Sequence, residues 1–317
     1  AEPVLQGDGL AVSLDSDLVD VDAWVPFLGD LGQQAGDRNL GKDYLPSNAL
    51  QPQSVSMRTA RLTVAGKELH DVVLGATRIG EFWNANIDSR EVQGFFSWRS
   101  ALPGQPIGTL TARFNKLEIP RSRVLEFENL LDAAPADLPA LDILADNFVL
   151  FEHPLGQLEL KATNSADPAR PRWTLDLLKI RNPAASFEAT GSWAPAAAGV
   201  RPTRLDFGMQ LSDSGGMLGR FGLKDVMRGG PGKVSGQVYW QGSPISIDYP
   251  TLGGKLKLAI GKGQFLKSEP GISKLIGVLS LQSLPRRLTL DFSDVFAKGF
   301  SFDEITGDVE IAYGVAR

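Results

Sequence analysis

Apolar and polar residues alternate one by one along much of this chain. Between residues 205 and 211, every odd position is apolar, from Leu205 to Leu211, and the positions between them are polar or glycine. The segments 255–260 and 287–292 alternate in the same way, with their bulky apolar residues at even positions. Because successive side chains of a strand point to opposite faces, these segments predict strands with one apolar and one solvated face, a pattern typical of antiparallel sheets.

Further alternating segments follow at short spacing, without the helices that separate the strands of a βαβ protein. They lie at 109–116, 155–162, 173–177, 234–240 and 305–313. Helical patterns are short, and they cover residues 22–29, 122–131, 216–223 and 272–279. The 34 glycines and 20 prolines fit a chain with many turns. We therefore expect a mainly β protein, an elongated and twisted antiparallel sheet with a few short helices.

The chain also repeats itself. The segment 61–77 aligns with the segment 147–163, and both copies continue to a tryptophan, Trp83 or Trp173. The copies close with further tryptophans, at Trp98, at Trp193 and, in a weaker third copy, at Trp240. Repeated antiparallel units that stack edge to edge make one long ribbon of sheet.

We expect four segments along this ribbon. An N-terminal strand and short helix occupy residues 1–40, and two repeat units occupy 41–137 and 138–200. A C-terminal unit with short capping helices occupies 201–317.

Charge and composition exclude several classes of function. The 32 basic and 37 acidic residues give a net charge of −5, which argues against a nucleic-acid-binding protein and against a cationic membrane-surface module. The chain has no cysteine, so disulfides, cysteine-based metal centres and thiol catalysis are excluded. No stretch approaches the ~18 apolar residues of a membrane span. Because the chain begins without Met and carries no signal peptide, we expect a piece excised from a longer protein.

Three segments carry part of a chemical motif. The segment 213–216 has the residues of a serine-protease nucleophile turn, but neither His70 nor His153 lies in a motif that supplies the base, so a turn after a strand is the simpler interpretation. The segment 261–263 lacks the flanking residues of a phosphate loop and predicts a bulge or tight bend. An acidic cluster lacks the glycine and closing glutamate of a calcium loop and predicts a solvated helix start: Asp15, Asp17, Asp20 and Asp22. We therefore expect no catalytic residue, metal site or cofactor.

The apolar faces of the strands are the stronger candidate for a site. Helices are too few to cover them, and a large uncovered apolar face serves a ligand, a membrane or a partner. The side chains that we expect to line an open groove are mostly aliphatic: Leu205, Phe207, Met209, Leu211, Val234, Val238, Leu256, Leu258, Ile260, Leu288, Leu290, Phe292, Val309 and Ile311.

Two motifs near the C-terminus are distinctive, Leu279-Ser-Leu-Gln-Ser-Leu-Pro-Arg-Arg-Leu and Phe300-Ser-Phe-Asp. With the segments 138–143, 154–160 and 189–193, they make most of residues 40–317 similar to the C-terminal region of the YhdP family of AsmA-like proteins.

This resemblance implies repeated β-groove units that stack into a hydrophobic trough. It implies a large parent protein in the Gram-negative envelope, held in the inner membrane by an N-terminal helix and projecting through the periplasm. The implied function is the transfer of phospholipid between the inner and outer membranes, with phospholipid acyl chains and, through the parent, both membranes as partners. The family has no catalytic motif to carry over, so we expect no enzyme.

Two other classes of function remain open. In a structural scaffold, the apolar faces would pack on one another and leave no trough. An enzyme that acts on envelope glycan or lipid would need convergent polar residues inside the trough.

Overall fold

The computed structural model describes residues 10–23, 52–64, 67–100, 108–120, 138–165, 171–195, 200–244, 247–266 and 300–316. The first part of the chain forms β1 (Leu10–Asp20), β2 (Pro52–Val64), β3 (Lys67–Ile79), β4 (Phe82–Asp88), β5 (Val92–Arg99), β6 (Thr109–Ile119), β7 (Ala140–Leu150) and β8 (His153–Asn164). The middle forms β9 (Trp173–Asn182), β10 (Ala185–Trp193), β11 (Pro202–Leu211), α3 (Ser214–Arg220), β12 (Met227–Gly229) and β13 (Gly232–Gln241). The last part forms η4 (Tyr249–Thr251), β14 (Gly253–Ile260), β15 (Gly263–Phe265), β16 (Phe300–Phe302), β17 (Ile305–Ala312) and β18 (Val315–Ala316).

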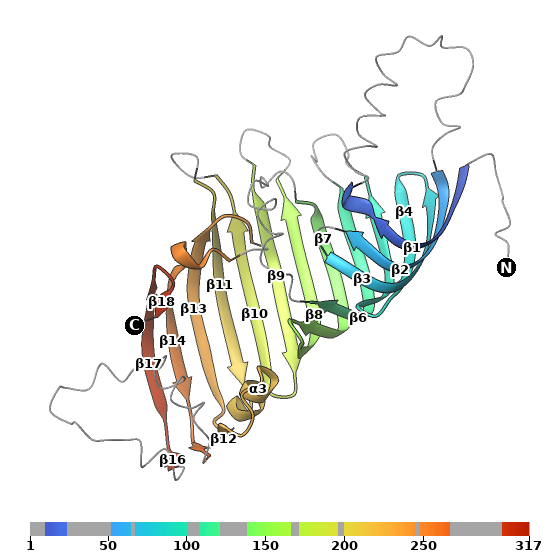
Figure 1. Ribbon diagram of the computed structural model, residues 1–317. Coiled ribbons are helices and arrows are strands. Elements are labelled where there is room, and N and C mark those ends of the chain that lie inside the picture. The colour runs from blue at the N-terminus through green and yellow to red at the C-terminus, as the bar shows by residue number, and fades with distance from the viewer. Residues whose placement is uncertain are drawn as a thin grey trace.

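One open sheet of 15 strands dominates the molecule, in the order β1-β2-β3-β4-β5-β6-β7-β8-β9-β10-β11-β13-β14-β17-β18. Figure 1 shows this sheet as a long ribbon that curves strongly over β1–β6 and flattens towards β17. Strands that follow one another in the chain are almost always neighbours, because short turns join them. The elongated, mainly β fold expected from the alternation is confirmed.

The antiparallel pairing expected from the sequence fails at two places. Strand β1 runs parallel to β2, and β6 runs parallel to β7. A parallel neighbour requires a connection that returns to the starting edge of the sheet, which a tight turn cannot provide. Residues 21–51 and 120–139 supply the necessary length of chain.

The two parallel pairs enclose five antiparallel strands, β2 to β6. Strands β2 to β6 form one antiparallel meander, and a second one begins at β7 and continues through β11, β13, β14 and β17 to β18. Leu62 and Phe148 are buried on the first strands of the two meanders, and Trp83 and Trp173 lie on the third strands. The internal repeat of the sequence is therefore also a repeat of structure. The sheet runs without a break past residues 137 and 200, so the division into separate units stays a prediction.

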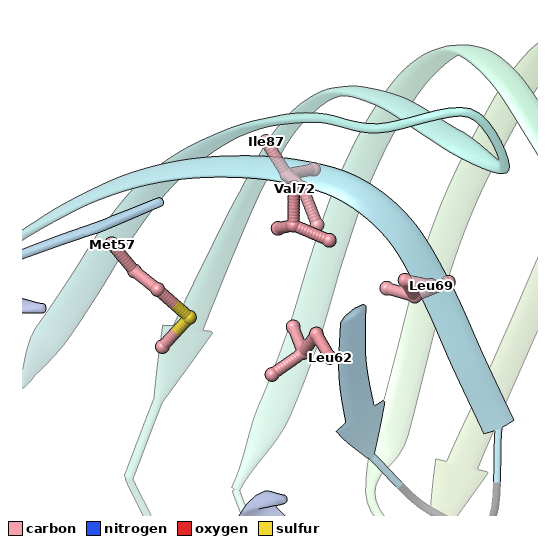
Figure 2. Close-up of a cluster of buried hydrophobic side chains, with 5 residues drawn as sticks. All are labelled: Met57, Leu62, Leu69, Val72 and Ile87. Atoms are coloured by element: carbon pink, nitrogen blue, oxygen red, sulfur yellow. The ribbon is translucent and has the colours of Figure 1, made fainter. Parts of the chain in front are cut away.

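The strongly curved part of the sheet encloses a hydrophobic cluster. Its buried members, which Figure 2 shows gathered beneath the arch of strands, are Met57, Leu62, Leu69, Val72 and Ile87. Leu14 of β1 and Phe114 of β6 pack against the same cluster. Because strands this far apart in the sheet meet one cluster, the apolar side of the sheet lies on the inside of the curve.

A small second sheet, in the order β12-β15-β16, lies at one edge of the large one. Three phenylalanine rings lie close together within it, with centroids 5.0 to 6.5 Å apart, and Phe265 stacks on Phe300 while Phe302 is tilted against both. The chain bends at Lys262, between the end of β14 in the large sheet and the start of β15 in the small one, so the tight bend predicted at 261–263 is confirmed. Helix α3 packs beside β12 (Figure 1) and corresponds to the helix expected at 216–223.

The acidic cluster near the N-terminus runs along a strand and ends at the start of a helix, because residues 21–23, which follow Asp20 directly, are helical. Asp15, Asp17 and Asp20 lie on β1, where an edge strand keeps these carboxylates in water. Asp20 ends the strand, and its Oδ1 accepts a hydrogen bond from the backbone N–H of Ala23 at 3.0 Å.

Several sequence predictions fall outside the described residues. They are the helices at 122–131 and 272–279, the helix at 22–29 beyond residue 23, and the strand at 287–292 with Leu288, Leu290 and Phe292.

Candidate functional site

Cross-strand pairing lines up apolar residues into rows that run along the length of the sheet. One row, which we call the central row, crosses every strand of the large sheet except β18. Its members are direct neighbours from strand to strand: Leu14, Met57, Leu74, Ile87, Gly94, Phe114, Ala145, Leu158, Ile180, Phe187, Met209, Val234, Leu258 and Gly307. At about 4.8 Å per strand, the central row is about 60 Å long.

A second row runs beside the central row, two residues away along each strand. It is also apolar throughout: Val12, Val55, Ala76, Ala85, Phe96, Ala112, Ile143, Leu160, Leu178, Ala189, Phe207, Gly236, Leu256 and Val309. A third row begins at β3 and consists of Arg78, Trp83, Trp98, Leu110, Leu141, Ala162, Leu175, Gly191, Leu205, Val238, Gly254 and Ile311. We call the side of the sheet that carries these rows the apolar face, and the opposite side the polar face.

The structure brings together all of the predicted groove residues that it describes. The central row holds Met209, Val234 and Leu258, the second holds Phe207, Leu256 and Val309, and the third holds Leu205, Val238 and Ile311. Leu211 and Ile260 lie on the same face, at one end of their strands. Whether these side chains contact a lipid stays a prediction.

Over β11 to β14, the middle of the apolar face is more accessible than its borders. In β11, Leu205, Phe207 and Met209 are half-buried, whereas Thr203 and Leu211 at the two ends are buried. The same holds on β14, where Leu256 and Leu258 are half-buried beside the buried Ile260. We call the three rows the floor. Over β11 to β14, buried strand ends border this floor on both sides.

Tryptophans form one border, which we call the tryptophan rim. Five lie there on the apolar face: Trp83, Trp98, Trp173, Trp193 and Trp240. Three of the indole N–H groups donate to loop carbonyls, from Trp173 to Pro139 at 3.0 Å, from Trp193 to Arg201 at 3.2 Å and from Trp240 to Ser243 at 3.0 Å. These bonds tie the loops to the end of the sheet, and Trp193 is completely buried.

Helix α3 and the small sheet form the other border, which we call the helix rim. Ala185, Leu211 and Ile260 are buried there. Met217 of α3, Met227 of β12 and Phe302 of β16 pack against them. Over β11 to β14, packed side chains thus close the apolar face at both edges, and the face is half-open between them.

The polar face carries paired charges. The carboxylate of Glu188 accepts a hydrogen bond from the ammonium of Lys179 on the neighbouring strand, and this contact holds the pKa of Glu188 below its ordinary value. In the same way, a hydrogen bond to Glu159 at 2.9 Å raises the pKa of Lys161. Charges of both signs in contact with water exclude acyl chains from this face.

The described residues do not assemble the alternative chemistries. The Ser214 hydroxyl donates to the carbonyl oxygen of Gly230 in a buried turn. His70 pairs with Glu91 at 2.8 Å, and the ring of His153 lies 5.6 Å from that of Phe221. Within the described ranges, no three His, Asp or Glu side chains gather in a metal-binding arrangement.

Comparison with known proteins places the chain in a family. The family model described as YhdP protein matches residues 1–317, the whole chain. The chain belongs to the YhdP family. A similar curated protein is the intermembrane phospholipid transporter YhdP of Escherichia coli (strain K12), which is 33% identical over 96 residues. That match covers 30% of this YhdP-family chain and 8% of the transporter.

No solved structure matches this YhdP-family chain. In the part of the chain that the structure describes, no helix is long and apolar enough to cross a bilayer.

Two features of the site were not predicted from the sequence. The rows extend through β1 to β5, and the signal for this was present in the alternation of Val55-Ser56-Met57 and of 74–76. The tryptophans were recognised only as markers of the repeat, because their common rim depends on the register of strands that are far apart in the chain.

Proposed function

We propose that this chain is part of the periplasmic conduit of an inner-membrane-anchored, bridge-like lipid transfer protein. Phospholipid acyl chains lie on the apolar face while the lipids pass between the inner and outer membranes. The observation that carries this proposal is the pair of uninterrupted apolar rows, central and second. Membership of the YhdP family and similarity to a protein named an intermembrane phospholipid transporter support it.

The rows give a physical mechanism for movement. Removing an acyl chain from water gains about 0.8 kcal/mol for each CH₂ that is buried. Each step along the central row exchanges one apolar contact for a similar one, so this gain changes little as the lipid advances. The side chains act as a solvent, and the chemistry of the lipid does not change.

The accessibility of the floor favours this function over a scaffold. If the apolar face only packed against other protein, its middle would be as buried as its borders. Instead, Phe207, Val238 and Leu256 are half-buried between rims that are closed. An enzyme would need convergent polar groups, and the central and second rows contain none.

Organic extraction of the purified chain, followed by mass spectrometry, tests the proposal. We expect phospholipids in the extract, in excess over those that bind a control protein of similar charge. Their absence, together with no uptake of added phospholipid, would contradict a conduit and favour the scaffold.

A matched pair of positions tests where the lipid lies. A photo-crosslinking amino acid at Phe207 faces the floor, whereas one at the neighbouring Asp206 faces the polar side. We expect phospholipid adducts at position 207 and none at 206, measured by mass spectrometry after irradiation. Equal adducts at both positions would show that lipid association does not depend on the apolar face.

A further inference from the structure

The first hairpin of the sheet bends at a point where its side chains change faces. On β2, Met57 and Thr59 are buried two residues apart, but the next buried residue, Leu62, follows after three. On β3, the buried Leu69 and Val72 are likewise three residues apart. Strict alternation would place Leu62 and Leu69 on the polar face, so the alternation slips by one residue on both strands.

The backbone is irregular at the same point on three neighbouring strands. Asp71 of β3 has φ +54°, in the left-handed region that residues other than glycine rarely adopt. The ladder between β2 and β3 skips Ala60 and Asp71, and the ladder between β1 and β2 skips Asp17 and Ala60. Pairing of β3 with β4 begins only at Val73. We call the part of the three strands that projects beyond this point the bent end: residues 18–20, 61–64 and 67–70.

The bent end covers part of the central row. Its Leu62 and Leu69 gather with Met57 and Ile87 in the cluster beneath the arch (Figure 2). Met57 and Ile87 belong to the central row, and each is only 9% exposed. On β11, Met209 of the same row is half-buried. An acyl chain that follows the central row therefore meets a covered stretch at β2 to β4.

A buried carboxylate holds the bent end in place. Glu91 lies in the turn between β4 and β5, and it is 9% exposed. Its Oε2 accepts a hydrogen bond from the backbone N–H of His70 at 2.8 Å, and its Oε1 lies 2.8 Å from Nδ1 of the same residue. Next to it, the Nε–H of Arg90 donates to Asp71 at 2.6 Å. Because a buried carboxylate is costly without partners, and both partners of Glu91 among the described residues are groups of His70, Glu91 favours the closed position.

The second meander repeats the bend with a different hold. Phe148 and Leu155 are buried near the tip of its first hairpin, each three residues from the next buried position of its strand. The left-handed residue there is Gly156, with φ +102°. Nδ2 of Asn182 donates to the carbonyl oxygen of Leu155 at 2.9 Å, and Arg220 of α3 donates to the same hairpin at 2.6 Å. The bend is thus a recurring feature, and a carboxylate on a turn holds the first copy where an amide and a helix hold the second.

We propose that the bent end is a lid over the central row at β2 to β4, that Glu91 keeps this lid closed, and that phospholipid occupies the covered stretch only while the lid is open. The inference rests on the proposed function and adds a controlled step to it. The irregular pairing at Asp71 is the hinge. When the lid opens, acyl chains replace Leu62 and Leu69 against the central row, so one apolar contact exchanges for another.

Two methionines of the central row allow a test within one molecule. Met57 lies beneath the bent end, and Met209 lies on the half-open floor. The 317-residue chain is produced with photo-methionine in place of methionine, incubated with vesicles of dioleoyl phosphatidylcholine and irradiated. Peptide mass spectrometry then locates the lipid adducts. We expect labelling at Met209 in the wild-type chain, and labelling about fivefold weaker or less at Met57.

Two substitutions release the lid. Glu91→Ala removes both contacts to His70, and we expect it to raise the labelling of Met57 about fivefold or more and to leave that of Met209 unchanged. Arg90→Gln removes the contact to Asp71, where both side chains are exposed, so it leaves the buried cluster intact. It should raise the labelling of Met57 by a smaller factor. If Glu91→Ala does not fold, Arg90→Gln decides alone.

Glu68 provides the matched control. It lies on the bent end and is exposed. Glu68→Ala removes the same charge as Glu91→Ala and should change the labelling of neither Met57 nor Met209. Melting temperatures of all three variants show whether any rise reflects unfolding.

Each other outcome is decisive. Unchanged labelling of Met57 in the folded variants of Glu91 and Arg90, or an equal rise in Glu68→Ala, overturns the role of Glu91. Labelling of Met57 as strong as that of Met209 in the wild-type chain shows that the bent end is no lid. If neither methionine of the wild-type chain is labelled, the proposed function itself fails.

Discussion

Single hydrogen bonds hold the loops of the tryptophan rim to the end of the sheet. The clearest case is Trp193, whose fully buried indole donates to the carbonyl oxygen of Arg201. Replacing it with phenylalanine removes the donor and leaves a smaller ring. We expect Trp193→Phe to lower the free energy of unfolding by about 2 kcal/mol, as measured by urea denaturation.

The neighbouring Ser192 on the polar face is the control for Trp193. Ser192→Ala should change the free energy of unfolding by less than about 0.5 kcal/mol. An equal effect of both substitutions would mean that this strand end is sensitive to any change.

The contact between Lys179 and Glu188 gives a prediction on pH. Because Lys179 lowers the pKa of Glu188, Lys179→Met should let that pKa rise towards its ordinary value of 4.5, as followed by NMR of the carboxyl carbon. The contact stabilises the fold above that ordinary value, and this contribution is lost as the pH falls through the lowered pKa of the folded state. The stability difference between wild type and variant should therefore shrink at acidic pH. If the difference in stability between wild type and Lys179→Met stays constant as the pH falls, the effect of the substitution comes from packing and not from the charge of Glu188.

At the level of strands, a glycine in β8 is required by backbone geometry. Gly156 has φ +102°, and a Cβ there would lie 2.2 Å from the carbonyl oxygen of Arg181 on β9. We expect Gly156→Ala to destabilise the protein by about 3 kcal/mol, measured by thermal or chemical denaturation, because strain and collision add. Gly75 lies in β3 with open space beside it, so Gly75→Ala should be tolerated. Comparable losses for both would argue against a special conformation at 156.

The sequence predicted where individual strands lie better than it predicted which strands pair and in which direction. Alternation is a local property, so the segment 205–211 was enough to identify β11 and its inward side chains. The parallel pairing of β6 with β7, and the curvature that brings Leu14 and Phe114 to one cluster, depend on contacts between distant segments. No local pattern encodes them. The tryptophan rim was missed for the same reason, because only the register brings Trp173 and Trp193 to one end of neighbouring strands.

At the scale of the whole molecule, the proposed conduit depends on continuity. Met209 lies in the central row, and Gln210 beside it points to the polar face. An ionised carboxylate among apolar groups costs several kcal/mol. In the full-length parent, Met209→Asp should therefore impair lipid transfer and outer-membrane integrity, whereas Gln210→Asp should have little effect.

Expression and melting behaviour must first be shown to match wild type for both variants. If the folded Met209→Asp protein supports envelope integrity as well as Gln210→Asp does, lipid does not move along the central row past β11. Equal failure of the two would point to a protein interface at this strand.

The two parallel pairs have a consequence for how such a molecule can grow. A meander of five strands ends at the rim opposite to the one where it began. A next meander joined to it by a tight turn would therefore start at that opposite rim, with its strands reversed relative to the first meander. The crossing connections before β2 and before β7 return the chain to the same rim each time. The meander that begins at β2 and the one that begins at β7 therefore have the same direction and the same inward positions. A tandem duplication within the gene would then lengthen the ribbon without inverting it, by about 24 Å for five strands. The distance that such a protein spans can in this way be set by the number of copies.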